Sequence, residues 1–124
     1  MRIARPGEAK LTVDRSRFYA VAFPASSMDQ VREAVRRLRA RHRKARHLCW
    51  ACRLREADGR LIEQSRDDGE VGHPGRVLLE LLRRDDMEGG LAVARIFGGV
   101  KLGVGGVSRA FRAAAEAALE DSRD

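Results

Sequence analysis

One stretch organises this chain: Arg95-Ile96-Phe97-Gly98-Gly99-Val100-Lys101-Leu102-Gly103-Val104-Gly105-Gly106-Val107-Ser108-Arg109-Ala110-Phe111. Five of the twelve glycines fall within nine of its positions. The apolar run over 91–97 predicts a strand before the glycines, and the alanine-rich run after them predicts a helix. The chain is therefore expected to pass from a strand into a helix through a glycine loop.

The glycine loop has the composition of an anion site. Glycine permits positive φ and close backbone approach, so several N–H groups and a helix N-terminus can point at one anion. Lys101 and Arg109 add positive charge. The alternative is that the glycines only turn the chain tightly and let the helix pack close to the sheet. The sequence leaves both interpretations open.

Nucleotide-binding fingerprints do not fit this loop. Lys101 is followed by Leu102, where a phosphate-binding P-loop has Ser or Thr. A dinucleotide loop would end in glycine, where this chain has Ser108. These differences argue against ATP and NAD, and we expect no cofactor.

Length and charge limit the possible partners. At 124 residues the chain predicts one domain, and its net charge of +7 favours polyanions such as RNA, DNA or an acidic protein face. Two cysteines and a polar start, Met1-Arg2-Ile3-Ala4-Arg5-Pro6, indicate the reducing cytoplasm. No apolar run approaches the length that spans a membrane, so we expect no membrane partner.

Strand and helix patterns alternate along the chain. Runs at 10–13 and 18–23 predict a hairpin, and further strands are predicted at 47–55, 61–65 and 91–97. Ser27 with Gln30 forms a capping-box pattern at the start of an amphipathic helix that continues to about residue 46. A second helix begins at Pro74 and a third follows the glycine loop. The apolar face predicted for the third helix is Val104, Val107, Phe111, Ala114 and Ala118. This order predicts an α+β fold, a two-layer sandwich in which helices cover one face of a mostly antiparallel sheet.

The first predicted helix is strongly basic. Residues 27–46 contain eight basic and two acidic side chains. The ordinary explanation is a solvated arginine face. The sharper explanation is a ridge that contacts phosphates without choosing a sequence.

Two further clusters bear on chemistry. Cys49 and Cys52 have the spacing of a metal pair, but residues three apart in a strand point to opposite faces, so we expect structural cysteines and no metal site. Asp67, Asp68 and Glu70 form the one acidic cluster. Such carboxylates can bind Mg²⁺ or act as acid and base, but ion pairs with Arg or Lys are the favoured interpretation.

Two long motifs resemble the YigZ/IMPACT family. The first is the stretch 95–111, and the second is the acidic run Asp67-Asp68-Gly69-Glu70. Ser16-Arg17-Phe18 and Ala45-Arg46-His47 are shorter matches. The resemblance spans about residues 14–119, and ordered motifs of this length are far more specific than a lone glycine loop. The chain departs from the family pattern at Val71, Val77 and Ile96.

The resemblance implies a fold and a role. The fold is an α+β domain like domain four of elongation factor G and one of the small-subunit ribosomal proteins. It implies a surface that faces nucleic acid or the ribosome, and eukaryotic relatives regulate translation by binding the activator of a stress-responsive initiation-factor kinase. The small C-terminal accessory domain of bacterial members has no counterpart here, so we expect a single YigZ/IMPACT-type domain over 1–124.

The leading hypothesis is a non-enzymatic RNA- or ribosome-binding domain that affects translation. The expected contacts surround the glycine loop: Arg95, Gly98, Gly99, Lys101, Gly103, Gly105, Gly106 and Arg109. The helix arginines form an auxiliary ridge: Arg32, Arg36, Arg39 and Arg43. One alternative is a protein-interaction module that docks its basic helix on an acidic partner. A metal-dependent enzyme using Asp67, Asp68 and Glu70 ranks last, because no nucleophile or complete set of metal ligands is evident.

Overall fold

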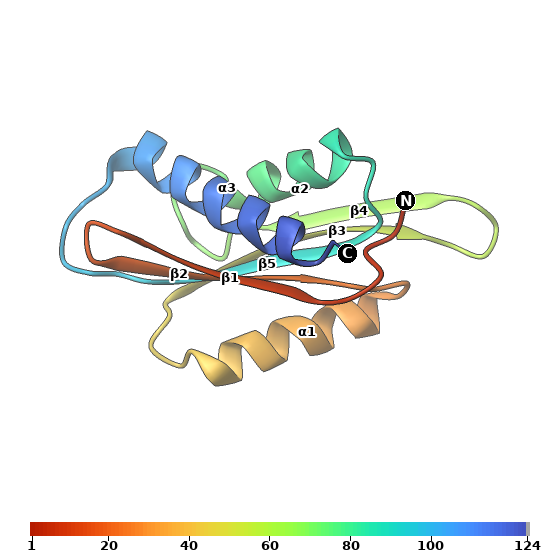
Figure 1. Ribbon diagram of the computed structural model, residues 1–124, viewed down its shortest axis with the longest axis horizontal. Coiled ribbons are helices and arrows are strands. Elements are labelled where there is room, and N and C mark those ends of the chain that lie inside the picture. The colour runs from red at the N-terminus through yellow and green to blue at the C-terminus, as the bar shows by residue number, and fades with distance from the viewer. Residues whose placement is uncertain (124) are drawn as a thin grey trace.

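The chain folds into one five-stranded antiparallel sheet with three helices (Figure 1). The computed structural model describes residues 1–123. The strand order is β1-β2-β5-β3-β4, and every neighbouring pair is antiparallel. The α+β class and the mostly antiparallel sheet are therefore confirmed. The elements are β1 (Gly7–Val13), β2 (Ser16–Phe23), α1 (Met28–Arg41), β3 (His47–Arg55), β4 (Leu61–Arg66), α2 (Pro74–Arg84), β5 (Gly89–Ile96) and α3 (Gly103–Asp121).

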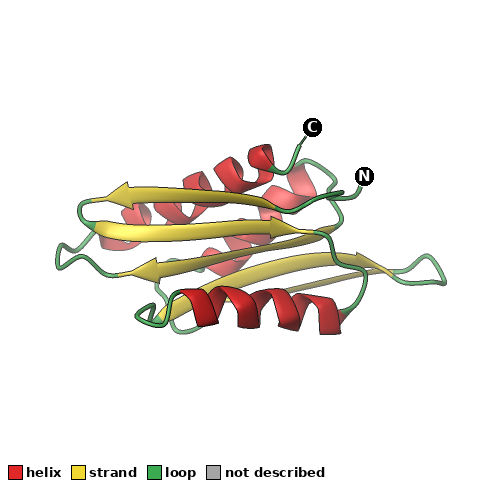
Figure 2. Ribbon diagram, turned by 60° about the horizontal axis from the view of Figure 1, so that its bottom comes forward, coloured by secondary structure: helices red, strands yellow, loops and turns green. Residues whose placement is uncertain are grey.

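The helices occupy both faces of the sheet, which corrects the expectation of two layers. Helices α2 and α3 cover one face, and α1 lies alone on the other (Figures 1 and 2). Alternate residues of β5 enter the two cores: Leu91 and Val93 pack with α2 and α3, whereas Ala92 and Ala94 pack with α1. A central strand that is apolar on both faces must be covered on both. Three layers result.

Helix α1 begins as predicted and ends earlier. The Ser27 side chain accepts a hydrogen bond from the Gln30 N–H, as an N-cap residue does. The helix stops at Arg41, because the next residue leaves helical geometry and the His42 ring stacks on Tyr19 with 3.9 Å between ring centroids. Residues 42–46, which were expected to continue the helix, instead connect α1 to β3.

Strand β3 alternates between the two cores as its sequence predicts. Cys49 and Ala51 face α2 and α3, whereas Leu48 and Cys52 face α1. The two thiols are therefore on opposite sides of the sheet, and both are buried and free. Helix α3 differs at its start, since Val104 was expected in its apolar face but is 60% exposed. Val104 lies in the first turn, before the helix reaches the sheet.

Candidate functional site

The antiparallel register brings the motif segments together at one end of the sheet. Residue Ile96, at the end of β5, pairs with Arg17 at the start of β2, and Arg95 pairs with His47 at the start of β3. Four connections therefore meet there: the turn 14–15, the segment 42–46, the acidic loop 67–73 and the glycine loop 97–102. They lie toward the left of Figure 1. We call these connections, together with the first turn of α3, the loop end.

A buried ion pair joins the acidic loop to β5. The Arg95 guanidinium lies 3.1 Å from a Glu70 carboxylate oxygen, and the two side chains are only 8% and 4% exposed. The same guanidinium approaches the rings of Phe18 and Phe97. Arg95 was expected to contact nucleic acid, but it is buried inside the protein. The predicted ion pairing of the acidic cluster is confirmed at Glu70.

The other two acidic residues hold backbone N–H groups. Asp67 accepts a hydrogen bond from the Gly75 N–H at 2.9 Å and thereby caps the start of α2. Asp68 accepts one from the Leu48 N–H at 2.8 Å, where β3 begins. The three carboxylates thus have separate structural partners. Within residues 1–123, no group of three or more His, Cys, Asp or Glu side chains is arranged to hold a metal ion.

Cys49 lies beneath the acidic loop and is a poor nucleophile. Its thiol donates a hydrogen bond to the Asp67 carbonyl oxygen at 3.1 Å. Burial raises the pKa of the Cys49 thiol, and the neighbouring carboxylates, Glu70 first, raise this pKa further. The thiol therefore stays protonated at neutral pH.

The glycines of the loop have different structural duties. A Cβ atom at Gly98 would lie within 2.2 Å of the Arg15 carbonyl group, so only glycine lets the loop pass over the turn 14–15. Gly99 and Gly103 have φ of 91° and 74°, in the left-handed region that favours glycine. Gly105 and Gly106 lie inside the first turn of α3. The tight-turn interpretation therefore explains Gly98, Gly99 and Gly103.

The N-terminus of α3 has no side-chain cap, so its backbone N–H groups are available to an anion. Leu102 precedes the helix and provides no side-chain cap, and the first turn has no acidic residue. By contrast, Ser27 caps α1 and Asp67 caps α2. The Arg109 guanidinium folds back beside Gly105, 3.0 Å from the position a Cβ atom would take there. The unsatisfied N–H groups of this turn and the positive end of the helix dipole thus lie next to a guanidinium.

The four arginines of the predicted auxiliary ridge do not form one unpaired basic surface. On α1, Arg32, Arg36 and Arg39 form ion pairs with Asp29, Glu33 and Asp68 at 2.6, 2.7 and 3.5 Å. Hydrogen bonds from Arg36 and Arg37 lower the pKa of Glu33 to about 2. Arg43 lies beyond the helix, in the segment 42–46. The helix is thus less positive than its sequence indicates.

Unpaired positive charge collects at the loop end instead. Within residues 1–123, most exposed basic side chains without an ion pair lie in its segments or on the strand and helix residues next to them. The sequence gave Lys101, Arg109 and Arg43 as candidates, but the rest emerge only once ion pairs are assigned. These side chains are Arg15, Arg17, Arg43, Lys44, Arg46, Arg66, Arg76, Lys101 and Arg109.

Exposed apolar side chains gather in the same place. Phe97, Val100 and Val104 are 55%, 41% and 60% exposed, and Val71 on the acidic loop is 50% exposed. Sequence reasoning missed them as surface residues and placed Val104 in the core. The sequence does contain a signal for this surface. Phe97, Val100 and Val104 are interspersed with glycines and Lys101 and follow neither a helical nor a strand period. Apolar surface beside unpaired cations is typical of an interaction surface.

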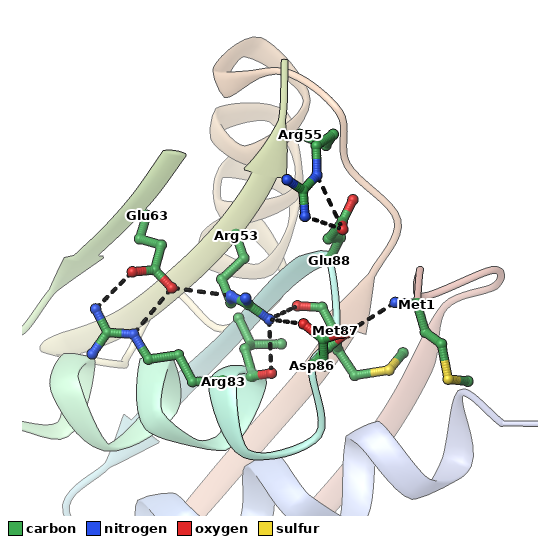
Figure 3. Close-up of polar contacts among 9 residues, drawn as sticks. Met1, Arg53, Arg55, Glu63, Arg83, Asp86, Met87 and Glu88 are labelled. Carbon is green, nitrogen blue, oxygen red and sulfur yellow. Dashed lines mark hydrogen bonds and ion pairs between the residues drawn. The ribbon is translucent and has the colours of Figure 1, made fainter. Parts of the chain in front are cut away.

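The opposite end of the sheet is organised differently (Figure 3). Arg53, which is nearly buried, donates to Glu63 at 3.0 Å and to the carbonyl oxygens of Leu82 and Met87. Arg83 donates to the same Glu63 carboxylate at 2.7 Å. The other pairs drawn there are Arg53 with the Asp86 carboxylate at 3.3 Å, Arg55 with Glu88, and the Met1 amino group with the Asp86 carbonyl oxygen. The basic groups drawn in Figure 3 thus have partners within the protein.

The family model for the Impact N-terminal domain matches residues 14–119, which include every segment of the loop end. The chain belongs to this family. The match confirms the resemblance drawn from the glycine stretch and the acidic motif. Among curated IMPACT family members, YvyE of Bacillus subtilis strain 168 is 33% identical over 111 residues. A Thermus thermophilus member described as lying in the pol 5′ region is 41% identical over 109 residues.

Solved structures share the fold. A crystal structure of a hypothetical protein matches with a TM-score of 0.86 and 29% identity, covering 94% of this chain and 58% of that one. The two-domain translational regulator Yih1 matches with a TM-score of 0.62 and 25% identity, covering 96% of this chain and 47% of that one. The two IMPACT relatives align with 88% and 86% of this chain but with only 50% and 56% of their own lengths. The chain therefore spans about half the length of the curated relatives that it matches.

No helix within residues 1–123 is both long enough and apolar enough to cross a membrane.

Proposed function

We propose that this domain acts in translation control by binding RNA, free or within the ribosome, through its loop end. The observation that carries the proposal is the separation of charge: within residues 1–123 most arginines elsewhere are paired with carboxylates, whereas those of the loop end, apart from the buried Arg95, are exposed and have no ion pair. Phosphate groups are the complementary partner for such a set, and the uncapped start of α3 offers backbone donors beside it. The link to translation rests on Yih1, a similar protein described as a translational regulator.

The expected chemistry is binding without catalysis. The acidic residues are engaged in capping and ion pairing, and the Cys49 thiol is buried. Lys101 and Arg109 contact phosphates in this proposal, and Phe97 supplies an aromatic face for an unstacked base. Arg95 has no contact with RNA, and its role is to hold the acidic loop against β5.

A salt titration with charge-matched variants tests the proposal. A labelled RNA hairpin with a single-stranded loop serves as the probe, and fluorescence anisotropy gives its affinity between about 50 and 200 mM salt. Lys101→Ala should weaken binding several-fold and reduce the slope of log K against log salt by about 1. Arg60→Ala is the control, because it removes the same charge from an exposed arginine at the opposite end that pairs with Asp58. Equal effects of the two variants would show that only total charge matters and would remove the loop end from the account.

A protein partner is the second candidate. It is favoured by the exposed Phe97, Val100, Val104 and Val71, since protein interfaces use apolar contacts surrounded by polar ones. This surface replaces the basic helix as the expected docking face, because the arginines of α1 are paired. Capture of a translation factor that survives nuclease treatment and is lost in Phe97→Ser would support it. Capture that Phe97→Ser leaves unchanged would argue against this face.

A further inference from the structure

A groove runs between α1 and the edge strand β4, on the face of the sheet that α1 covers alone. It encloses about 450 Å³, and Trp50 of β3 forms part of its lining. Helix α1 packs above β5 and β3, so the strip of sheet formed by Trp50 and β4 is not fully covered. Trp50 is half-buried there and is the only tryptophan of the chain. The groove therefore presents one aromatic side chain to solvent.

The apolar part of the groove continues from Trp50 onto the helix. Val35 and Met28 of α1 line it next to the indole. Both are partly buried against the core that α1 covers. A planar aromatic group that entered the groove would thus meet the indole of Trp50 and aliphatic side chains, as a stacked base does in single-strand binding sites.

The rims of the groove are basic. Helix α1 contributes Arg36 and Arg39, and β4 contributes Arg66 and the amide of Gln64, with Asp68 as the one acidic group of the lining. Arg66 has no ion pair among the described residues. Arg36 is paired with Glu33 and Arg39 with Asp68, so Arg66 is the rim cation that is available to a phosphate. The groove thus combines an aromatic floor with a positive rim.

Arg66 also connects the groove to the loop end. It is the last residue of β4, directly before the acidic loop, and it pairs in register with Trp50. Arg66 therefore links the loop end to the indole, and Asp68 is the one acidic side chain in the lining of the groove.

We propose that this groove binds one unstacked nucleotide of single-stranded RNA, with its base on Trp50 and its phosphate on Arg66. The inference rests on the proposed function and adds a preference for single strands. A duplex keeps its bases paired and stacked, so it can use the cations of the loop end but not the indole. The amide of Gln64, in the lining of the groove, can donate to and accept from the edge of the base.

Tryptophan fluorescence tests the proposal directly, since the signal comes from Trp50 alone. Titration of the wild-type chain with a single-stranded polyuridine oligonucleotide should quench this fluorescence, whereas the same strand in a duplex with polyadenosine should bind with little quenching. A polyglutamate peptide is the third probe. Quenching by polyglutamate and not by the single strand would overturn the proposal in favour of an acidic protein partner.

Affinity measurements with labelled polyuridine provide the second test. Trp50→Leu should lower the affinity about tenfold, while Trp50→Phe keeps an aromatic face and should lose much less. Arg66→Ala, at an exposed position where folding is not at risk, should also weaken single-strand binding and leave duplex binding less affected. If Trp50→Leu does not fold, Arg66→Ala and the wild-type fluorescence still decide the question.

The outcomes separate this inference from the proposed function. RNA binding that depends on Lys101 but leaves Trp50 fluorescence unchanged would refute the groove and keep the loop end. Absence of RNA binding by the wild-type chain would refute both.

Discussion

Arg53 and Lys101 are both basic residues near the two ends of the sheet, yet their surroundings are opposite. Arg53 is nearly buried and donates to two carboxylates and two carbonyl oxygens. Lys101 is exposed, lies in a loop between glycines, and has exposed Val100 and Phe97 as neighbours. One end of the sheet uses its charges to hold the fold, and the other leaves them available. The difference shows that net charge locates a binding surface only after the ion pairs have been assigned.

A buried pair supports the available charges from below. Arg95 and Glu70 lie under the glycine and acidic loops and are shielded from solvent. A hydrogen bond from the Ser108 hydroxyl to the Gly72 carbonyl oxygen, at 2.8 Å, adds a second link between the acidic loop and α3. The loop end is therefore expected to be held in place even though its surface groups are unpaired.

The largest expected effect follows from disrupting the buried ion pair between Arg95 and Glu70. Glu70→Gln leaves the Arg95 guanidinium buried without a counter-charge and should lower the free energy of unfolding by about 3 to 5 kcal/mol, measured by urea denaturation. Glu88→Gln is the matched change at the opposite end, where the partner Arg55 is 42% exposed, and should cost no more than about 1 kcal/mol. Similar losses in the two variants would contradict the distinction between a buried and a half-exposed pair.

The second comparison is between two glycines of the same stretch. Gly98→Ala places a methyl group against the Arg15 carbonyl and should destabilise the fold by about 2 kcal/mol. Gly105→Ala meets only the flexible end of Arg109 within a helix and should stabilise the fold by about 0.5 to 1 kcal/mol. Thermal unfolding followed by circular dichroism measures both. A destabilising Gly105→Ala would mean that this glycine is needed for more than the turn of a helix.

A smaller effect concerns pH at the opposite end. The hydrogen bond from Arg83, with a further contribution from Arg53, lowers the pKa of Glu63 below its usual 4.5. The stabilisation that the Glu63 carboxylate provides is therefore fully present above about pH 4.5 and is lost as the pH falls through the lowered pKa of Glu63. Glu63→Gln should be less stable than wild type by about 1 kcal/mol at pH 7, and the difference should shrink as the pH falls through the lowered pKa. A difference that stays constant with pH would show that the charge of Glu63 is not what stabilises this end.

Local patterns in the sequence predicted the elements well. Alternation in β3 put Cys49 and Cys52 on opposite faces, and the Ser27 cap located the start of α1. The end of α1 was missed because a tertiary contact, the stacking of His42 on Tyr19, ends the helix earlier than its apolar period does. Three layers could have been anticipated from the unbroken apolar run Leu91-Ala92-Val93-Ala94, which is typical of a strand covered on both faces.

The site was harder to predict than the fold. The sequence correctly indicated that the acidic motif forms ion pairs, but it could not show that Arg95 is the partner and is therefore buried. It also overestimated the α1 ridge, because Asp68 neutralises Arg39 from a distance of 29 residues along the chain. Pairings between remote residues decide which charges remain available, and a single sequence does not encode them in any local period.

Hydrogen–deuterium exchange with and without bound RNA tests the central claim most directly, because it compares the two ends in one experiment. We expect slower exchange on RNA binding in residues 97–106 and 68–72, and no change in residues 53–63 and 82–88 at the opposite end. Protection of residues 53–63, with residues 97–106 unchanged, would contradict the account.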